Sequence, residues 1–173
     1  MSSEGYREAA EAGGAKIRAD VVECHVLRRV GDDWEFLLLR RTKAPLEGTW
    51  QPVLGHCERG EGSVACVVRE LREEIGLDAR DGARCDGMYA LEQVRPFYVW
   101  RIDAVVLGPR FAAVVRDGFE PVLNGEHDGH RWVLLSDAVR EAHWPGQRDA
   151  LAEIRWLLSD EGRSARDSLR VNC

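Results

Sequence analysis

The sequence predicts an α/β fold, in which a mixed β-sheet lies between layers of helices as an α/β/α sandwich. Strand-like apolar runs occur on both sides of one amphipathic helix, and a second amphipathic helix follows the last run. The chain has 173 residues, 45% of them apolar, which suits one domain with a sizeable core. The pattern alone does not fix the order of the strands in the sheet.

The first two predicted strands form a hairpin. Residues 21–30 and 34–41 are rich in apolar residues, and Gly31-Asp32-Asp33 supplies a turn between them. A loop is expected over residues 43–48, and residues 50–54 lead from it to the central helix.

The central helix is predicted over residues 63–75, after a loop punctuated by glycines. Ser63 is expected to cap its first turn, and Gly76 is expected to end it. Apolar residues at spacings of three and four predict one buried face, made of Val64, Val67, Val68, Leu71 and Ile75.

The second half of the chain predicts more strands and then two helices. The expected strands cover residues 85–95, 97–107, 109–115 and 131–135, with a break at Pro96 and a loop over residues 123–127. Ser136 is expected to cap a short helix over residues 137–142, and an amphipathic helix is expected over residues 147–158 after a break at Pro145 and Gly146.

These elements divide the chain into three parts. Residues 1–16 are polar and are expected to be a flexible N-terminal leader, with a brief helix over Glu4–Glu11. Residues 17–159 carry the predicted domain, and residues 160–173 are expected to be a loose, polar C-terminal tail.

Composition excludes several classes of protein. The net charge is −6 and acidic and basic residues are mixed, so duplex nucleic acid is an unlikely partner. Five cysteines without a CxxC pair fit a reducing compartment better than a disulfide framework or a zinc site. No apolar run is long enough to span a bilayer, and the N-terminus lacks a signal-peptide core. We therefore expect a cytoplasmic protein without a membrane partner.

Three acidic residues crowd one face of the central helix. Glu70, Glu73 and Glu74 lie within an arc of about 100° near the C-terminal end, where they repel one another and the helix dipole. A solvated acidic face is one interpretation of this pattern. The other is a site for a hard divalent cation such as Mg²⁺, which prefers oxygen ligands.

The spacing around these acids carries a family resemblance. Residues 55–77 match the pattern Gly-x5-Glu-x7-Arg-Glu-U-x-Glu-Glu-x-Gly-U, in which U is aliphatic, at every defined position. The matching residues are Gly55, Glu61, Arg69, Glu70, Leu71, Glu73, Glu74, Gly76 and Leu77. This is the Nudix box, so the chain resembles the Nudix hydrolases, which cleave a diphosphate linked to another group using Mg²⁺ or Mn²⁺. The resemblance implies a Nudix-type sandwich.

The resemblance also implies roles for individual residues. Glu70, Glu73 and Glu74 would be catalytic and would bind Mg²⁺, with Mn²⁺ as the other candidate, helped by the backbone carbonyl of Leu54. Glu61 and Arg69 would pair and orient the glutamates. Glu126, in a downstream loop, is the candidate general base and a further metal ligand; the alternative is a base within the box helix.

Candidate substrate contacts lie outside the box. Arg40 and Arg41 end a predicted strand and would contact phosphate, because a guanidinium fork suits phosphate oxygens. Tyr89, Phe97 and Tyr98 are candidates for holding a base or pterin ring, although a half-buried position in the sheet explains any single one of them better. A zinc site at His127 and His130 is disfavoured, because no third ligand is in register.

Softer similarities point to one branch of the family. FLLLRR, TWQPVLGHCERGEG, GPRFAA, LNGEHDGHRWVLLSDA and HWPGQRDALAEI resemble the dATP and dihydroneopterin triphosphate pyrophosphatases. The expected reaction converts a (deoxy)nucleoside or dihydroneopterin triphosphate to the monophosphate and pyrophosphate. The alternatives are a dinucleoside polyphosphate (diadenosine tetraphosphate) hydrolase and an inactive nucleotide-binding module. The partner would be this small molecule, and the protein a monomer or homodimer.

Overall fold

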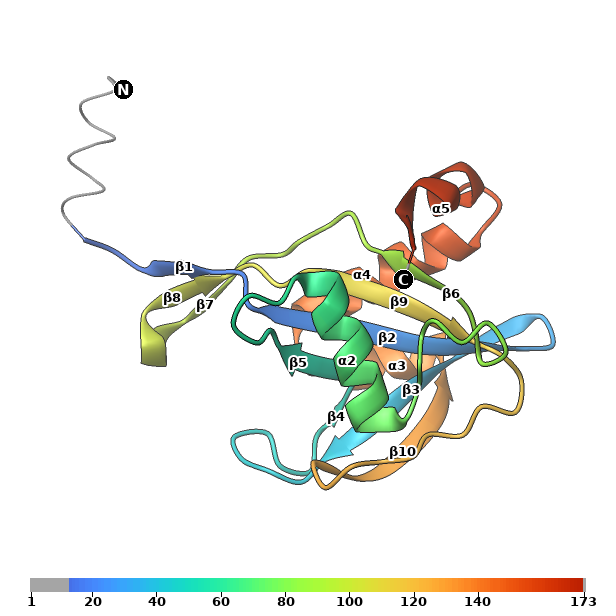
Figure 1. Cartoon of the computed structure of the whole chain (residues 1–173), viewed down its shortest axis with the longest axis horizontal. Coiled ribbons are helices and arrows are strands. Elements are labelled where there is room, and N and C mark those ends of the chain that lie inside the picture. The colour runs from blue at the N-terminus through green and yellow to red at the C-terminus, as the bar shows by residue number, and fades with distance from the viewer. Residues whose placement is uncertain (1–12, 173) are drawn as a thin grey trace.

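The central β-sheet has the strand order β10-β3-β2-β9-β6-β11 in the computed structural model, which describes residues 13–172 (Figure 1). Strand β2 runs parallel to β9, whereas β10, β3, β6 and β11 pair with their neighbours in antiparallel fashion, so the sheet is mixed as predicted. Its members are β2 (Val21–Val30), β3 (Asp33–Arg41), β4 (Trp50–Gln51), β5 (Val53–His56), β6 (Cys85–Ala90), β9 (Arg110–Val115), β10 (His127–Leu134) and β11 (Arg170–Val171).

Helices cover both faces of this sheet, which confirms the predicted α/β/α sandwich. Helix α2 (Ser63–Ile75) crosses one face, and α3 (Leu135–Glu141) and α4 (Pro145–Leu158) lie behind the other (Figure 1). Side chains alternate between the faces along each strand. Leu37 and Leu39 of β3 therefore join the core under α2, whereas Phe36 joins the core under α3 and α4.

Strands β2 and β3 diverge from their hairpin, and the chain segment before α2 fills the fork. Their paired register runs from Val30↔Asp33 to Leu27↔Phe36. Beyond this point β4 pairs with β3, with Gln51 opposite Leu39, and β5 pairs with β2. The fork thus positions the residues that immediately precede the box helix in the middle of the sheet.

Helix α2 has the predicted bounds but not the predicted cap. Gly76 ends it in the left-handed conformation (φ 68°), as expected for a glycine at this position. Gly62 occupies the N-cap position without a side-chain hydrogen bond, so the prediction that Ser63 caps the helix is wrong. Val64 is 40% exposed in the first turn, beside an exposed loop, and Cys66 takes a buried place on the face instead.

The predicted strand over residues 97–107 is in fact two short strands. Strand β7 (Phe97–Val99), a 3₁₀ turn (Trp100–Ile102) and β8 (Ala104–Val106) form a small separate sheet with β1 (Lys16–Arg18), in the order β1-β8-β7. Asp103 closes the turn with φ 46°, which a non-glycine residue rarely adopts and the sequence did not signal. The preceding strand, β6, ends at Ala90 rather than at residue 95.

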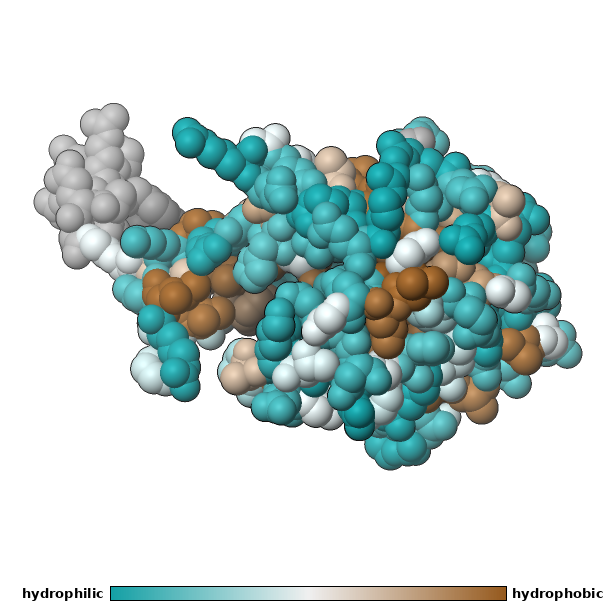
Figure 2. All heavy atoms as spheres, turned by 60° about the horizontal axis from the view of Figure 1, so that its bottom comes forward, coloured by the Kyte–Doolittle hydropathy of each residue, from teal (hydrophilic) through white to brown (hydrophobic). Residues whose placement is uncertain are grey.

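The small sheet exposes a group of apolar side chains, seen at the left of Figure 2. Its members with large exposed areas are Ile17, Phe97, Tyr98, Trp100 and Ile102.

The last of the predicted strands and the two predicted helices after it begin earlier than expected. Strand β10 starts at His127 rather than at residue 131. Helix α3 starts at Leu135, so Ser136 lies inside it and does not cap it. Helix α4 starts at Pro145, because proline is well suited to a first helical position, where no amide hydrogen is needed.

The C-terminal tail is structured as far as it is described, which overturns the expectation of a loose segment. Helix α5 (Arg163–Leu169) is followed by β11, which pairs with β6 at the edge of the main sheet. Leu169 and Val171 pack against the two cores and compensate for the polar composition of the segment. The predicted leader helix at Glu4–Glu11 lies outside the described residues. Within residues 13–172, no helix is long and apolar enough to cross a membrane.

Candidate active site

The side chain of Glu70 lies directly against the backbone of Gly55 in β5. A Cβ atom at position 55 would lie 2.1 Å from Cγ, 2.2 Å from Cδ and 2.4 Å from Oε1 of Glu70. No real Cβ tolerates such distances, so only glycine lets the helix place this carboxylate against the strand. Burial raises the pKa of Glu70.

Arg69 holds three carboxylates together. Its Nε and Nη2 donate to the two carboxylate oxygens of Glu61 at 3.1 and 2.9 Å, and its Nη1 donates to Glu70 at 2.9 Å and to Glu73 at 3.1 Å. Nη2 also donates to the backbone oxygen of His56 at 2.9 Å. The hydrogen bonds from Arg69 lower the pKa of Glu61 to about 2. One guanidinium therefore connects the loop, strand β5 and helix α2.

Glu74 is the most buried of the acids. Its residue is 2% exposed, and its Oε2 has no hydrogen-bond partner among the described residues. Burial raises its pKa to about 8, with further contributions from the charges of Glu70 and Glu126. The Nδ1 of His127, also buried and without a hydrogen bond there, lies 3.9 Å from Oε2 of Glu74. The other ring nitrogen of His127 lies 3.4 Å from Nε2 of Gln51.

Basic side chains surround the outer edge of this cluster. Lys43 Nζ lies 3.0 Å from Oε1 of Glu126, and this contact lowers the pKa of that carboxyl group. The charge of Arg41 acts on both Glu74 and Glu126 and favours their ionised forms. Arg40 donates from Nε to Asp128 at 2.7 Å. Of the two predicted phosphate contacts, Arg41 lies within electrostatic reach of the buried acid, whereas Arg40 already has a carboxylate partner.

The donor set suits a hard divalent cation. Within residues 13–172, no group of three or more His, Cys, Asp or Glu side chains is arranged to hold a metal ion with the side chains as they stand. However, Glu74 has a buried oxygen without a hydrogen-bond partner among the described residues, and burial, followed by the charges of Glu70 and Glu126, raises its pKa. A cation would offset both effects. The backbone of Leu54 contacts the Glu74 carboxylate. These residues fit a cation held by Glu70 and Glu74, with Glu73 at the exposed edge.

The structure does not gather the predicted ring-binding aromatics beside these acids. Tyr89 packs against the core under α3 and α4, on the opposite face of the sheet from α2. Phe97 and Tyr98 are exposed on the small sheet, where the hydroxyl of Tyr98 donates to Asp103 at 2.8 Å. These three aromatic residues therefore serve sheet packing or lie on the exposed surface, and they do not line a common groove for a ring.

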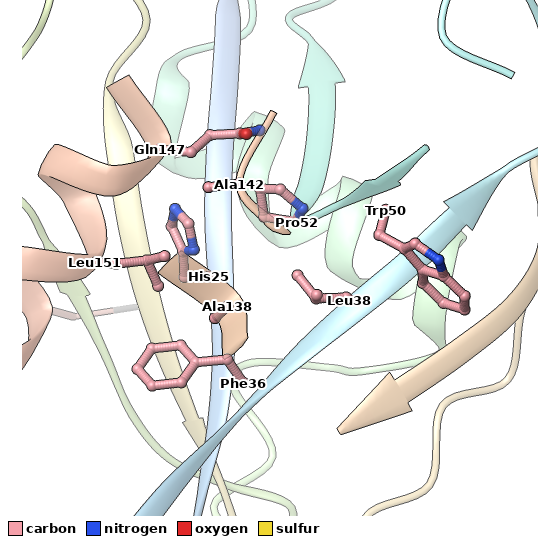
Figure 3. Close-up of a pocket in the computed structure, with 9 residues that line it drawn as sticks. All are labelled: His25, Phe36, Leu38, Trp50, Pro52, Ala138, Ala142, Gln147 and Leu151. Atoms are coloured by element: carbon pink, nitrogen blue, oxygen red, sulfur yellow. The ribbon is translucent and has the colours of Figure 1, made fainter. Parts of the chain in front are cut away.

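A hollow lies at the fork on the face opposite α2 (Figure 3). Side chains alternate along the chain here: Gln51 faces His127, whereas its neighbours Trp50 and Pro52 line the hollow together with His25. The ring of Trp50 also has the guanidinium of Arg131 at 4.0 Å from its centroid. The remaining lining residues are Phe36, Leu38, Ala138, Ala142, Gln147 and Leu151.

Sequence reasoning missed three residues at the site: Gln51, Lys43 and His127, the last of which was considered only as a zinc ligand. His130 contacts Glu120 at 3.5 Å and lies away from His127's partners, so the zinc alternative has no support. These residues could have been found only by predicting that β3 pairs with β10. That pairing places the residues after Arg41 beside those before His127.

The sequence profile of the NUDIX domain matches residues 18–154, most of the chain. The chain belongs to the Nudix family. A bis(5'-nucleosyl)-tetraphosphatase (asymmetrical) from Sus scrofa is 30% identical over 125 residues, covering 72% of this chain and 80% of that protein. The protein of the same name from Mus musculus is 29% identical over 130 residues, with the same coverage.

Solved structures share the fold of this Nudix domain. An Ap4A hydrolase from Caenorhabditis elegans has a TM-score of 0.66 and 21% identity, covering 81% of this chain and 97% of its own. The dihydroneopterin triphosphate pyrophosphohydrolase of E. coli has a TM-score of 0.63 and 20% identity, covering 78% and 95%. The branch of triphosphate pyrophosphatases is thus one structural neighbour among several. The chain is a Nudix hydrolase that acts on diphosphate bonds, and such enzymes generally use divalent metals.

Replacing Gly55 by alanine should lower turnover by about 10²-fold, because the new methyl group would displace the Glu70 carboxylate by an ångström or more. Gly62→Ala is the matched control, since a Cβ there meets no atom within 4 Å and the residue has φ −82°. Steady-state kinetics and circular dichroism of both variants make the test. Equal activity of the two variants would contradict the account of the Gly55 contact.

Replacing Arg69 by lysine should reduce kcat by at least about tenfold, because one ammonium group cannot hold Glu61, Glu70 and Glu73 at once. Arg72→Lys, on the same helix but paired with Asp78, should keep nearly normal rates. The measurement is kcat with saturating metal. A lysine variant at position 69 with wild-type kcat would show that the guanidinium fork does not organise the site.

Proposed function

We propose that this chain is a Mg²⁺-dependent pyrophosphohydrolase of nucleotide polyphosphates, with Mn²⁺ as a substitute metal. The observation that carries the proposal is the cluster of Glu70, Glu73 and Glu74, in which Arg69 binds Glu70 and Glu73 and Glu70 lies against β5. When bound, the cation would neutralise phosphate charge and acidify a water molecule for attack on phosphorus. Glu70 and Glu74 would hold it, together with the Leu54 carbonyl.

The side chains of the protein have separate tasks in this proposal. Arg69 and Glu61 keep the carboxylates oriented, so that little reorganisation is needed when substrate arrives. Arg41 and Lys43 place positive charge beside the carboxylates of Glu74 and Glu126, where an anionic polyphosphate would bind. Glu126 lies beside Lys43 and is the proposed acceptor of the proton from the attacking water.

The favoured substrate is a dinucleoside polyphosphate. Support comes from the curated relatives of pig and mouse, whose names specify an asymmetrical bis(5'-nucleosyl)-tetraphosphatase and which align over nearly three quarters of the chain. The proposed reaction cleaves diadenosine tetraphosphate to ATP and AMP.

A (deoxy)nucleoside or dihydroneopterin triphosphate is the second candidate. The segment LNGEHDGHRWVLLSDA supports it, because it resembles that branch and contributes Glu126 and His127 to the site. An inactive binding module is the third reading, and the intact set of carboxylates argues against it. All three candidates share the acidic residues of helix α2, so only the products of the reaction can distinguish them.

The deciding experiment incubates the protein and Mg²⁺ with diadenosine tetraphosphate, dATP and dihydroneopterin triphosphate and identifies products by chromatography. ATP plus AMP from the first substrate, at the highest kcat/KM, is the expected result. Faster release of pyrophosphate from a triphosphate would favour the second candidate, and no turnover on any of the three would refute the enzymatic proposal.

Glu126→Gln should reduce kcat by about 10²-fold or more; a near-silent effect would move the base into the box helix.

A further inference from the structure

Two cysteine side chains meet beside the box helix. Cys57 directly follows β5 and packs against the core that contains Cys66, a residue in the first turns of α2, and the two thiols are close enough to interact. An independent contact fixes the two segments together: Nη2 of Arg69 donates to the backbone oxygen of His56 at 2.9 Å and to Sγ of Cys66 at 3.6 Å. One donor, Nη2 of Arg69, therefore links the residue before Cys57 to the sulfur of Cys66.

The two thiols differ in their access to solvent. Cys66 is 0% exposed in the core under α2, whereas Cys57 is half-buried and packs on the edge of that core. A small solute can therefore reach Cys57 first, and Cys66 only as the partner of Cys57. Burial raises the pKa of the Cys66 thiol, and the adjacent Cys57 raises it further, which disfavours the thiolate form of Cys66.

We propose that Cys57 and Cys66 are a redox modification site, which forms a reversible disulfide in the presence of a hydroperoxide and thereby slows hydrolysis. Nothing in the Nudix box requires cysteine at either position, since both fall among its undefined residues. The claim about hydrolysis rests on the proposed function, whereas the claim about the disulfide does not.

The reaction balances with one hydroperoxide per pair. The Cys57 sulfur attacks a peroxide oxygen, the O–O bond breaks, and the leaving hydroxide takes the thiol proton to give water and a sulfenic acid. The Cys66 sulfur then attacks the sulfenic sulfur, the S–O bond breaks, and hydroxide leaves as water with the Cys66 proton. The thiols lose two electrons and the peroxide gains them. A dithiol reverses the step by exchange.

The new bond would disturb the anchor of the carboxylates. A disulfide brings the two sulfur atoms to about 2.05 Å, well inside the separation of two thiols in contact. The loop that it closes carries Glu61, and the sulfur that it captures is the one that accepts from Arg69. A shift of about 1 Å in catalytic groups is enough to cost about 10²-fold in rate.

The test treats the full-length protein with hydrogen peroxide and follows mass, disulfide-linked peptides and turnover. We expect a loss of two hydrogens, a Cys57–Cys66 linked peptide and at least a tenfold fall in kcat, all reversed by dithiothreitol. Cys57→Ser should keep its activity in peroxide. Cys85→Ala, which removes a cysteine of the same core outside the loop, should still be inactivated.

Each contrary result overturns a defined part of the proposal. Free thiols at positions 57 and 66 after treatment, or a linkage through other cysteines, would refute the site. A complete Cys57–Cys66 disulfide with unchanged kcat would refute the effect on hydrolysis. If the reduced protein turned over no nucleotide, the proposed function would fail, while the linked peptide and the Mg²⁺ affinity of the two forms, measured by calorimetry, would still decide the redox site.

Discussion

The close approach of helix α2 to strand β5 is the constraint on which the site depends. Glu70 can lie on the strand only because Gly55 has no side chain, and the contact leaves no room for a methyl group. Once the helix is that close, its acids are crowded and partly buried, which raises the pKa of Glu74. Arg69 relieves part of this repulsion by bridging Glu61, Glu70 and Glu73. A cation would relieve the rest, because Oε2 of Glu74 has no hydrogen-bond partner within residues 13–172.

The forked sheet brings distant segments to this point. Because β2 and β3 diverge, β4 and β5 lie between them and deliver Gly55 to the centre of the sheet. On its other edge β3 pairs with β10, and this pairing places His127 opposite Arg41. Thr42 then donates its amide to the backbone oxygen of Glu126 and holds the two loops together. The basic residues Arg41 and Lys43 therefore lie at the same edge of the sheet as Glu126.

How far the sequence predicts this arrangement depends on whether the signal is local. The spacing of the box predicts the bounds of α2 and its glycine stop, because periodicity and caps act within a few residues. The contact of Gln51 with His127 joins residues 76 positions apart and leaves no local trace. The small sheet was missed because a turn at Asp103, without glycine, divides an apolar run that reads as one strand. The polar tail was expected to be loose, yet Leu169 and Val171 suffice to dock it.

The most direct measurement is a crystal structure of the protein with Mg²⁺ and a non-hydrolysable dinucleoside polyphosphate. The account predicts an ion within bonding distance of Glu70 and Glu74, about 2.1 Å, that also contacts a phosphate oxygen. Side chains of Glu70, Glu73 and Glu74 that point to solvent, with the polyphosphate bound elsewhere and no ion between them, would contradict it.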